Sequence, residues 1–284
     1  MIDPMLSAHH SVPARPRWKE LLVGMYQALF CRPIFYPLNR RLFLMSLRGI
    51  GVLNSGPAVA ESERRLVGKI LKLDPRSLIM DVGAHIGEYS TLILQAFPEA
   101  QLHAFEPHPD SFKKLELLRS GHQNFRAVNA ALGATNGKVS FYDYENSGGS
   151  AHASLYQAVI EDVHHGMAKE IEVERQTIDE YCSTHSLETI SLLKIDTEGS
   201  ELDVLHGARH MLASGAIIVI QFEFNEMNII SRTFLRDFQE LLKDYSLFRS
   251  LPGGFVPFDY LSVFEIFGYQ NFVAVRKGHE VLLD

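Results

Sequence analysis

Acidic residues stand beside glycines at two points of the chain where an apolar run gives way to a helical pattern. The first point is DVGAHIGEYS, residues 81–90, and the second is KIDTEGSE, residues 194–201. In the first, Gly83 and Gly87 allow the backbone to turn tightly and to approach a ligand closely. A tight turn between a strand and a helix is the usual place for a nucleotide-like ligand in α/β proteins.

The charge at the first turn selects the kind of ligand. Its Gly-x-x-x-Gly spacing differs from the G-x-G-x-x-G phosphate fingerprint, because Ala84 and His85 occupy the middle. The carboxylate of Asp81 would repel a pyrophosphate at this position, whereas it would attract an ammonium or sulfonium ion. S-adenosylmethionine carries both of these cations together with an adenosine, so it is the predicted cofactor.

A second acid is placed to bind the ribose of such a cofactor. Glu106 ends the apolar run HAFEP about 20 residues after the glycines, where an acid accepts hydrogen bonds from the ribose hydroxyls. Alone, Glu106 would equally suit a surface position at a helix start, and the combination with Asp81 favours the ribose role. The residues of these two turns that we predict to bind the cofactor are Asp81, Gly83, Ala84, His85, Gly87, Tyr89, Ser90, Glu106 and Pro107.

The second acidic cluster supplies candidates for the chemistry of methyl transfer. Along a strand, alternation sends Lys194, Asp196 and Glu198 to one side. Methyl transfer to a hydroxyl is an in-line displacement, in which the protein aligns the acceptor and removes its proton. We expect Asp196 to be the base or the acceptor clamp and also to touch the cofactor, followed by Glu198, Lys194 and Glu223 as further catalytic candidates. Helix capping explains the neighbouring Thr197, Ser200 and Glu201.

Two alternatives to a carboxylate acting alone stay open. No metal is expected, but a divalent cation bridging Asp196 and Glu223 to a diol is the alternative, since hard cations prefer carboxylate oxygens. A histidine suits proton transfer near neutral pH, so His152 or His164 is the alternative base. Both histidines lie in residues 143–170, a stretch rich in Gly, Ser and His that we expect to be an insertion covering the substrate.

Alternating strands and helices are expected to position these residues. Short apolar runs and helical patterns alternate along the chain, which predicts an α/β fold with a mainly parallel, seven-stranded sheet and helices on both faces. Ligands of such sheets bind beyond the carboxyl ends of the strands. The expected strands cover residues 77–83, 101–107, 125–132, 138–144, 171–178, 190–196, 216–224 and 272–277.

The first part of the chain differs in composition from the rest. Up to Arg48 it contains seven Lys and Arg against two acids, and residues 18–30 show apolar side chains at helical spacing. We expect residues 1–56 to form a helical appendage, and residues 57–284 the catalytic domain. The appendage would pack on the core or on a second subunit of a homo-oligomer; a peripheral membrane contact is the alternative, and no run is long enough to span a bilayer.

Overall composition narrows the class of protein further. The net charge of -7 argues against a nucleic-acid partner, because such proteins normally present a basic face. Two cysteines are too few for a disulfide framework and indicate a reducing, cytoplasmic location.

Several blocks of the sequence resemble a known family. In order, DVGAHIGEYS, AFEPHPDSFKKL, VNAALG, LLKIDTEGSELDVLHGA and IQFEFNE are similar to blocks of the FkbM-type S-adenosylmethionine-dependent methyltransferases. The resemblance implies a Rossmann-like class I methyltransferase fold and O-methylation of a small molecule or glycan, such as a sugar or polyketide. It also implies that Asn129 and Ala130 lie beside the adenine. His85 stands where the family usually has asparagine, which leaves the role of its side chain open.

Two other functions compete with this one. A dinucleotide-dependent oxidoreductase would need an uncharged strand end and the closer glycine pair, which are both missing from residues 81–87. A noncatalytic module would keep the crevice for structure alone, and the presence of Asp81, Gly83, Glu106 and Asp196 speaks against such decay.

Overall fold

The computed structural model describes residues 17–54 and 57–283, and the chain separates into two compact units, Met1–Gly49 and Ile50–Asp284. In the first unit, α1 (Arg17–Phe30), η1 (Pro33–Phe35) and α2 (Tyr36–Gly49) follow one another. The amide of Asn39 links the two helices, because it accepts a hydrogen bond from Tyr26 Oη and donates one to the carbonyl of Phe30. The helix expected over residues 18–30 is therefore confirmed. No described helix is both long and apolar enough to cross a membrane.

The second unit begins at Ile50, before the boundary expected at residues 56/57. The reason is that the linker already belongs to the larger unit: Val52 is fully buried, and the N–H of Leu53 donates to the carbonyl of Tyr269 at 2.7 Å.

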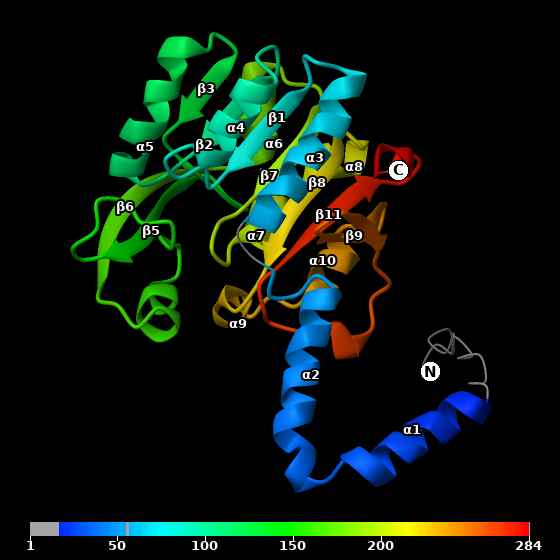
Figure 1. Ribbon diagram of the computed structural model, residues 1–284. Helices are drawn as coiled ribbons and strands as arrows, with labels where there is room; N and C mark the ends of the chain where they lie inside the picture. Colours follow the sequence, from blue (N-terminus) through cyan, green and yellow to red (C-terminus); the bar gives the residue numbers. More distant parts are fainter. Residues whose placement is uncertain (1–16, 55–56, 284) are drawn as a thin grey trace, which may run out of the picture. The chain divides into compact units, whose positions relative to one another are not determined.

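The larger unit is built on an eight-stranded sheet with the order β10-β9-β11-β8-β7-β1-β2-β3 (Figure 1). From β3 to β8 the strands run parallel, and β11 is antiparallel to both β8 and β9. The strands of this sheet are β1 (Leu78–Val82), β2 (Gln101–Phe105), β3 (Phe125–Val128), β7 (Ile190–Ile195), β8 (Ile217–Phe224), β9 (Tyr245–Leu251), β10 (Gly254–Pro257) and β11 (Gln270–Arg276).

The predicted α/β fold is confirmed, but the count of seven strands is wrong. Two expected strands, β5 (Gly137–Tyr144) and β6 (Ala168–Gln176), pair with β4 (Ala131–Leu132) in a separate three-stranded sheet. The main sheet instead gains β9 and β10, which the sequence pattern did not predict. In β9 the buried positions are Tyr245, Leu247 and Arg249, and the charged Arg249 interrupts the apolar alternation that would have revealed the strand.

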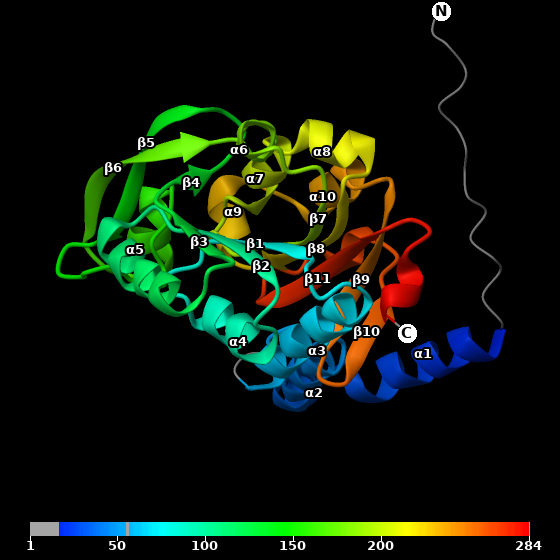
Figure 2. The same cartoon turned by 90° about the horizontal axis from the view of Figure 1, so that it is seen from above.

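Helices cover both faces of the main sheet (Figure 2). One face packs against α3 (Pro57–Leu73), α4 (Glu88–Ala96) and α5 (Pro109–Glu116). The other packs against α6 (Ile178–His185), α7 (Glu201–His206), α8 (Arg209–Ser214) and α10 (Leu235–Leu241). The remaining short helices are α9 (Met227–Ser231), η2 (Leu117–Gly121), η3 (Val159–Val163), η4 (Ser262–Phe264) and η5 (Glu280–Leu283).

The face under α3 changes from apolar to polar as the strands approach their carboxyl ends. Ile79, Leu192 and Val219 are fully buried and stand side by side on β1, β7 and β8. Side chains two residues further along each strand point to the same face. In this next row, neighbouring strands contribute Asp81, Lys194 and Gln221.

The turn after β1 lies directly against the turn after β7. The N–H of Asp196 donates to the carbonyl of Val82 at 3.0 Å, and Gly83 has a left-handed backbone with φ of 79°. A Cβ atom at Gly83 would come within 1.7 Å of the carbonyl oxygen of Asp196. Only glycine therefore allows both turns to occupy this position.

We expect Gly83→Ala to destabilise the fold by about 3 kcal/mol, because it adds both backbone strain and a clash with Asp196. Chemical denaturation measures this change in the free energy of unfolding. Gly121→Ala is the matched control: a Cβ atom there meets nothing within 4 Å, so its effect should stay within about 0.5 kcal/mol. Equal stability of the two variants would contradict the close approach of the turns.

Candidate active site

Two cavities open at the carboxyl ends of the parallel strands. The inner cavity has a mainly apolar wall that includes Phe105, Ala130, Leu132 and Phe141, with the carboxylate of Glu106 among them. The outer cavity is lined by many charged side chains together with apolar surface, and its volume of about 650 Å³ lies within the range of small-molecule sites. The residues that line both cavities are Gly83, His85, Ala151, Asp196 and Glu198.

Glu106 is held as a fixed acceptor in the wall of the inner cavity. Its Oε2 accepts a hydrogen bond from the backbone N–H of His85, and its Oε1 accepts one from the N–H of His108, both at 2.8 Å. Burial raises the pKa of Glu106 to about 7, although these two hydrogen bonds act in the opposite direction. The carboxylate thus gains or loses its charge near neutral pH.

His85 connects the turn after β1 to the segment between β5 and β6. Its backbone is left-handed, with φ of 50°, a conformation that asparagine adopts more readily than most residues. Its Nε2 lies 3.1 Å from the carbonyl oxygen of Gly149. The side chain therefore contacts the predicted insertion, while the backbone N–H is used by Glu106.

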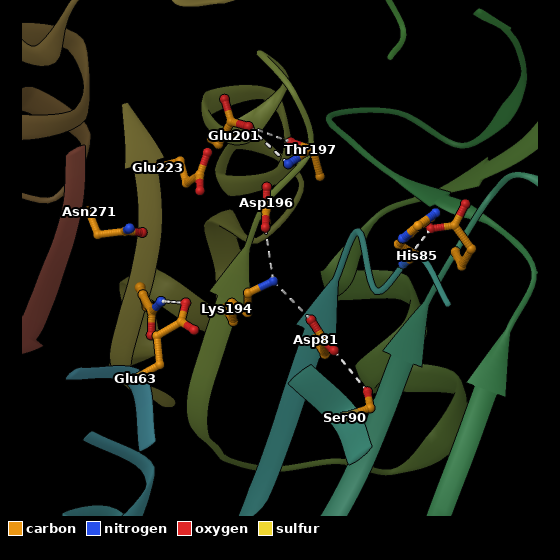
Figure 3. Close-up of polar contacts among 12 residues, drawn as sticks. Glu63, Asp81, His85, Ser90, Lys194, Asp196, Thr197, Glu201, Glu223 and Asn271 are labelled. Atoms are coloured by element: carbon orange, nitrogen blue, oxygen red, sulfur yellow. Dashed lines mark hydrogen bonds and ion pairs between the residues drawn. The ribbon is translucent and has the colours of Figure 1, made fainter. Parts of the chain in front are cut away.

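Lys194 lies between two carboxylates at the centre of the site (Figure 3). Its Nζ is 3.4 Å from Oδ1 of Asp81 and 3.2 Å from Oδ2 of Asp196. Burial alone would lower the pKa of Lys194, but Asp196, Asp81 and Glu63 outweigh it and raise that pKa well above its usual value. The lysine is thus a permanent cation inside the protein.

Asp81, a predicted cofactor-binding residue, lies outside the walls of both cavities. It has no exposed surface and accepts a hydrogen bond from Ser90 Oγ at 2.8 Å. Its charge is directed to Lys194, so Asp81 acts on the site through that residue. Ser90 and Gly87 also line neither cavity, because Ser90 is buried against Asp81 and Gly87 packs against Leu115 and Leu118.

Most of the other predicted residues meet at the two cavities. Ala84, Tyr89, Lys194, Glu223, His152 and His164 line the outer one, and Glu106, Pro107 and Ala130 line the inner one. Asn129 lines neither of them. Its Nδ2 donates to the carbonyls of Glu106 and Pro107 at 2.8 and 3.0 Å, so it fixes the turn that carries Glu106.

Three carboxylates at the junction differ in their surroundings. Asp196 is about one-third exposed and forms an ion pair with Lys194. Glu198 has a left-handed backbone, with φ of 53°, and its buried Oε2 has no hydrogen-bond partner among the described residues. Glu223 is 9% exposed and accepts a hydrogen bond from Asn225 Nδ2 at 3.1 Å. Burial, reinforced by the charge of Asp196, raises the pKa of Glu198 and of Glu223 well above the usual value.

Residues between β5 and β6 line both cavities. The rings of His152 and His164 stack with their centroids 4.0 Å apart, and Tyr144 Oη lies 3.0 Å from His152 Nδ1. Burial lowers the pKa of His164. Ser154 Oγ donates to the carbonyl of Glu198 at 2.7 Å. This segment is therefore tied to the turn that carries the second acidic cluster.

The metal alternative gains no support from the geometry. Within residues 17–54 and 57–283, no three His, Cys, Asp or Glu side chains are grouped so that they could hold a metal ion.

Several wall residues were missed by sequence reasoning, above all Glu63. Its Oε1 accepts a hydrogen bond from Gln221 Nε2 at 2.8 Å, and burial raises its pKa. A signal did exist: Glu63 precedes the buried Leu66 and Val67 by three and four residues, which puts an acid on the apolar face of its helix. The other missed residues, Ala151, Asn225, Glu226 and Tyr269, lie in loops or at helix starts where no periodicity applies.

Comparison with known proteins identifies the class of enzyme. Residues 81–245 match the family model of the Methyltransferase FkbM domain. The 2-O-methyltransferase NoeI of Sinorhizobium fredii (strain NBRC 101917 / NGR234) is 27% identical over 67% of this chain and 80% of its own length. Methyltransferase sdnD of Sordaria araneosa is 27% identical over 49% of this chain, and the chain spans only 62% of it. The chain therefore belongs to the FkbM methyltransferase family, as the sequence blocks predicted.

Solved structures give weaker matches. Methyltransferase FkbM from Methylobacillus flagellatus KT aligns with 13% identity and a TM-score of 0.43, covering 70% of this chain and 44% of that one. The plantazolicin methyltransferase BpumL in complex with SAH aligns with 13% identity and a TM-score of 0.42, covering 92% and 98%. TM-scores below 0.5 do not establish a shared fold. The α/β fold is therefore assigned from the strand order, and the family from the family match.

We expect Lys194→Met to destabilise the protein by about 3 to 5 kcal/mol, since it leaves the buried charge of Asp81 without its cation. Adding Asp81→Asn should recover much of that loss, because the uncompensated charge is then gone. The measurement is urea denaturation of both variants. Lys138→Met is the control, since its ion pair with Glu172 is exposed and its stability should stay close to wild type. If Lys194→Met were as stable as the control, the structural role assigned to the ion pairs of Lys194 would be contradicted.

Proposed function

We propose that this protein is an S-adenosylmethionine-dependent O-methyltransferase that acts on a hydroxyl of a small molecule or glycan. The observation that carries the proposal is that Asp196 and Glu198 line both cavities. A methyl donor in the inner cavity and an acceptor in the outer one would meet at these carboxylates. Membership of the FkbM family and the similarity to a 2-O-methyltransferase support the same reaction.

The residues of the inner cavity fit the adenosine part of the cofactor. Ala130, Leu132 and Phe141 offer an apolar wall to a planar base. Glu106 has lone pairs left for the ribose hydroxyls after it accepts its two backbone hydrogen bonds. The turn at Gly83 to His85 leads from this cavity to the outer one. S-adenosylmethionine, when bound, supplies a methyl group on a positively charged sulfur.

The protein's own task in the reaction is to orient the acceptor and to take its proton. Asp196 lies at the junction and is held in place by Lys194, so we assign it the hydrogen bond from the acceptor hydroxyl and then the proton. Glu198 and Glu223 are the next candidates for the base, and either His152 or His164 is the alternative from the facing segment. Residues 143–170 would cover the acceptor during transfer.

The proposal also covers the partner of the N-terminal unit and the cellular location of the enzyme. The N-terminal helical unit is proposed to contact a second subunit, with an anionic membrane surface as the alternative, since residues 17–49 carry six Lys and Arg against one acid. Both cysteines, Cys31 and Cys182, are free, which supports a reducing, cytoplasmic location.

The affinity for S-adenosylhomocysteine should fall about tenfold between pH 8 and pH 6. Ribose hydroxyls donate to the ionised carboxylate of Glu106, so binding is strong above the pKa of about 7 and weakens below it. Calorimetry across this range measures the slope. Glu106→Gln should bind more weakly and lose this slope, while it retains every other titrating group. An unchanged slope in the variant would remove Glu106 from the ribose site.

Asp196→Asn should retain binding of S-adenosylhomocysteine and lose about a hundredfold or more of its turnover, because an amide cannot accept the proton. The measurement is methyl transfer from S-adenosylmethionine to a panel of sugars and polyketides that carry free hydroxyls. The control Asp259→Asn removes an exposed carboxylate from a loop and should not change the rate. Full turnover by the Asp196 variant would place the chemistry on another residue.

A further inference from the structure

The part of the outer cavity that is separate from the inner one carries an excess of acids. Four carboxylates line only the outer cavity: Glu63, Glu88, Glu223 and Glu226. Among the described residues of this wall, Lys194 is the one basic side chain apart from histidines, and its ammonium already contacts Asp81 and Asp196. The part of the cavity assigned to the acceptor is therefore rich in acids, which disfavours acceptors with phosphate or carboxylate groups.

Glu63 and Glu223 extend the polar row across the sheet (Figure 3). Glu63 reaches from α3 to Gln221 on β8, and Glu223 stands two residues further on the same face of that strand. On the neighbouring strands Glu223 faces Asn271, and Lys194 pairs with Gln221. The two carboxylates thus belong to one continuous polar surface beside the junction.

Glu223 is buried and Glu63 is partly buried, and among the described residues neither forms an ion pair, although the charge of Lys194 lowers the pKa of Glu63. Burial is the main factor that raises the pKa of Glu63 and of Glu223, and the nearby charge of Asp196 adds to it for each. Clustered buried acids of this kind become stable as anions only when a cation binds beside them. A neutral polyol would not offset the negative charge of these acids, whereas an ammonium group beside them would.

A second observation points to a ligand with several hydrogen-bond donors. Three polar atoms of residues in the same wall are buried and have no hydrogen-bond partner among the described residues, namely Glu198 Oε2, Tyr89 Oη and His164 Nε2. Unsatisfied buried polar atoms are rare in folded proteins, so their presence at a cavity indicates groups that a ligand satisfies.

We propose that the acceptor is an amino alcohol, such as an amino sugar, whose ammonium group binds at Glu63 and Glu223 while its hydroxyl faces Asp196. This inference rests on the proposed function. It also explains why the oxygen and not the nitrogen of the acceptor receives the methyl group. A protonated amine has no lone pair, so an ammonium group held by carboxylates is not methylated. The bond between sulfur and the methyl carbon then breaks, its electron pair stays on sulfur, and S-adenosylhomocysteine is the leaving group. The methyl carbon bonds to the hydroxyl oxygen, and the hydroxyl proton passes to the base.

The test compares three probes of one scaffold on protein saturated with S-adenosylhomocysteine. The probes are D-glucosamine, N-acetyl-D-glucosamine and D-glucuronate, which carry an ammonium, a neutral amide and a carboxylate. Calorimetry should show glucosamine binding at least about tenfold more tightly than either other probe, as expected for one charge-assisted contact. Saturation with the product cofactor keeps the cofactor site filled in every titration, so the probes report on the rest of the outer cavity.

Two variants assign the preference to the proposed residues. Glu63→Gln should remove most of it, because the amide keeps the hydrogen bond from Gln221 and loses only the charge. Glu223→Gln should have the same effect, and the control Glu99→Gln, an exposed acid in a loop, should keep the preference intact. Equal binding of the three probes, no binding of glucosamine, or an intact preference in both cavity variants would overturn the inference. In each of these cases, the proposed function would still stand if S-adenosylhomocysteine binds. If S-adenosylhomocysteine does not bind, both this inference and the proposed function would be wrong.

Discussion

The whole site depends on one buried ammonium group that balances two carboxylates. Lys194 on β7 lies between Asp81 on β1 and Asp196 in the turn after β7. Asp81 has no exposed surface. Buried charges persist only when they are paired, so these three residues fix one another. The pairing also holds the turns after β1 and β7 at the short separation that Gly83 allows. The shape of both cavities follows from this contact.

Three of the residues that line the outer cavity, Ala60, Glu63 and Tyr269, lie outside the part of the chain that matches the family model. The family match covers residues 81–245, whereas Glu63 comes from α3 and Tyr269 from the loop before β11. Residues 81–245 therefore supply most of the outer cavity wall, and the flanking segments add the remaining residues. Function of this kind lives in the site grafted on a fold rather than in the fold itself.

Sequence reasoning succeeded where periodicity and local turn chemistry determine structure. The parallel strands, the glycine turn and the positions of Glu106 and Asp196 at the cavities follow from short-range patterns. It failed where a contact joins distant segments. The contact of Asp81 with Lys194, 113 residues away, depends on strand pairing that no local pattern encodes. Likewise, β9 was missed because the buried Arg249 interrupts its apolar pattern. The guanidinium is stabilised by the rings of Phe258 and Phe272, and the contact with Phe272 joins two different strands.

His85 performs two tasks at once, and this couples events on the two sides of the site. Its backbone N–H supports Glu106, and its ring reaches Gly149 in the segment facing the acceptor. A movement of that segment would therefore displace His85, and His85 also positions Glu106 in the wall of the inner cavity. Occupancy of either cavity is thus expected to steady the wall of the other, and the coupling is reciprocal.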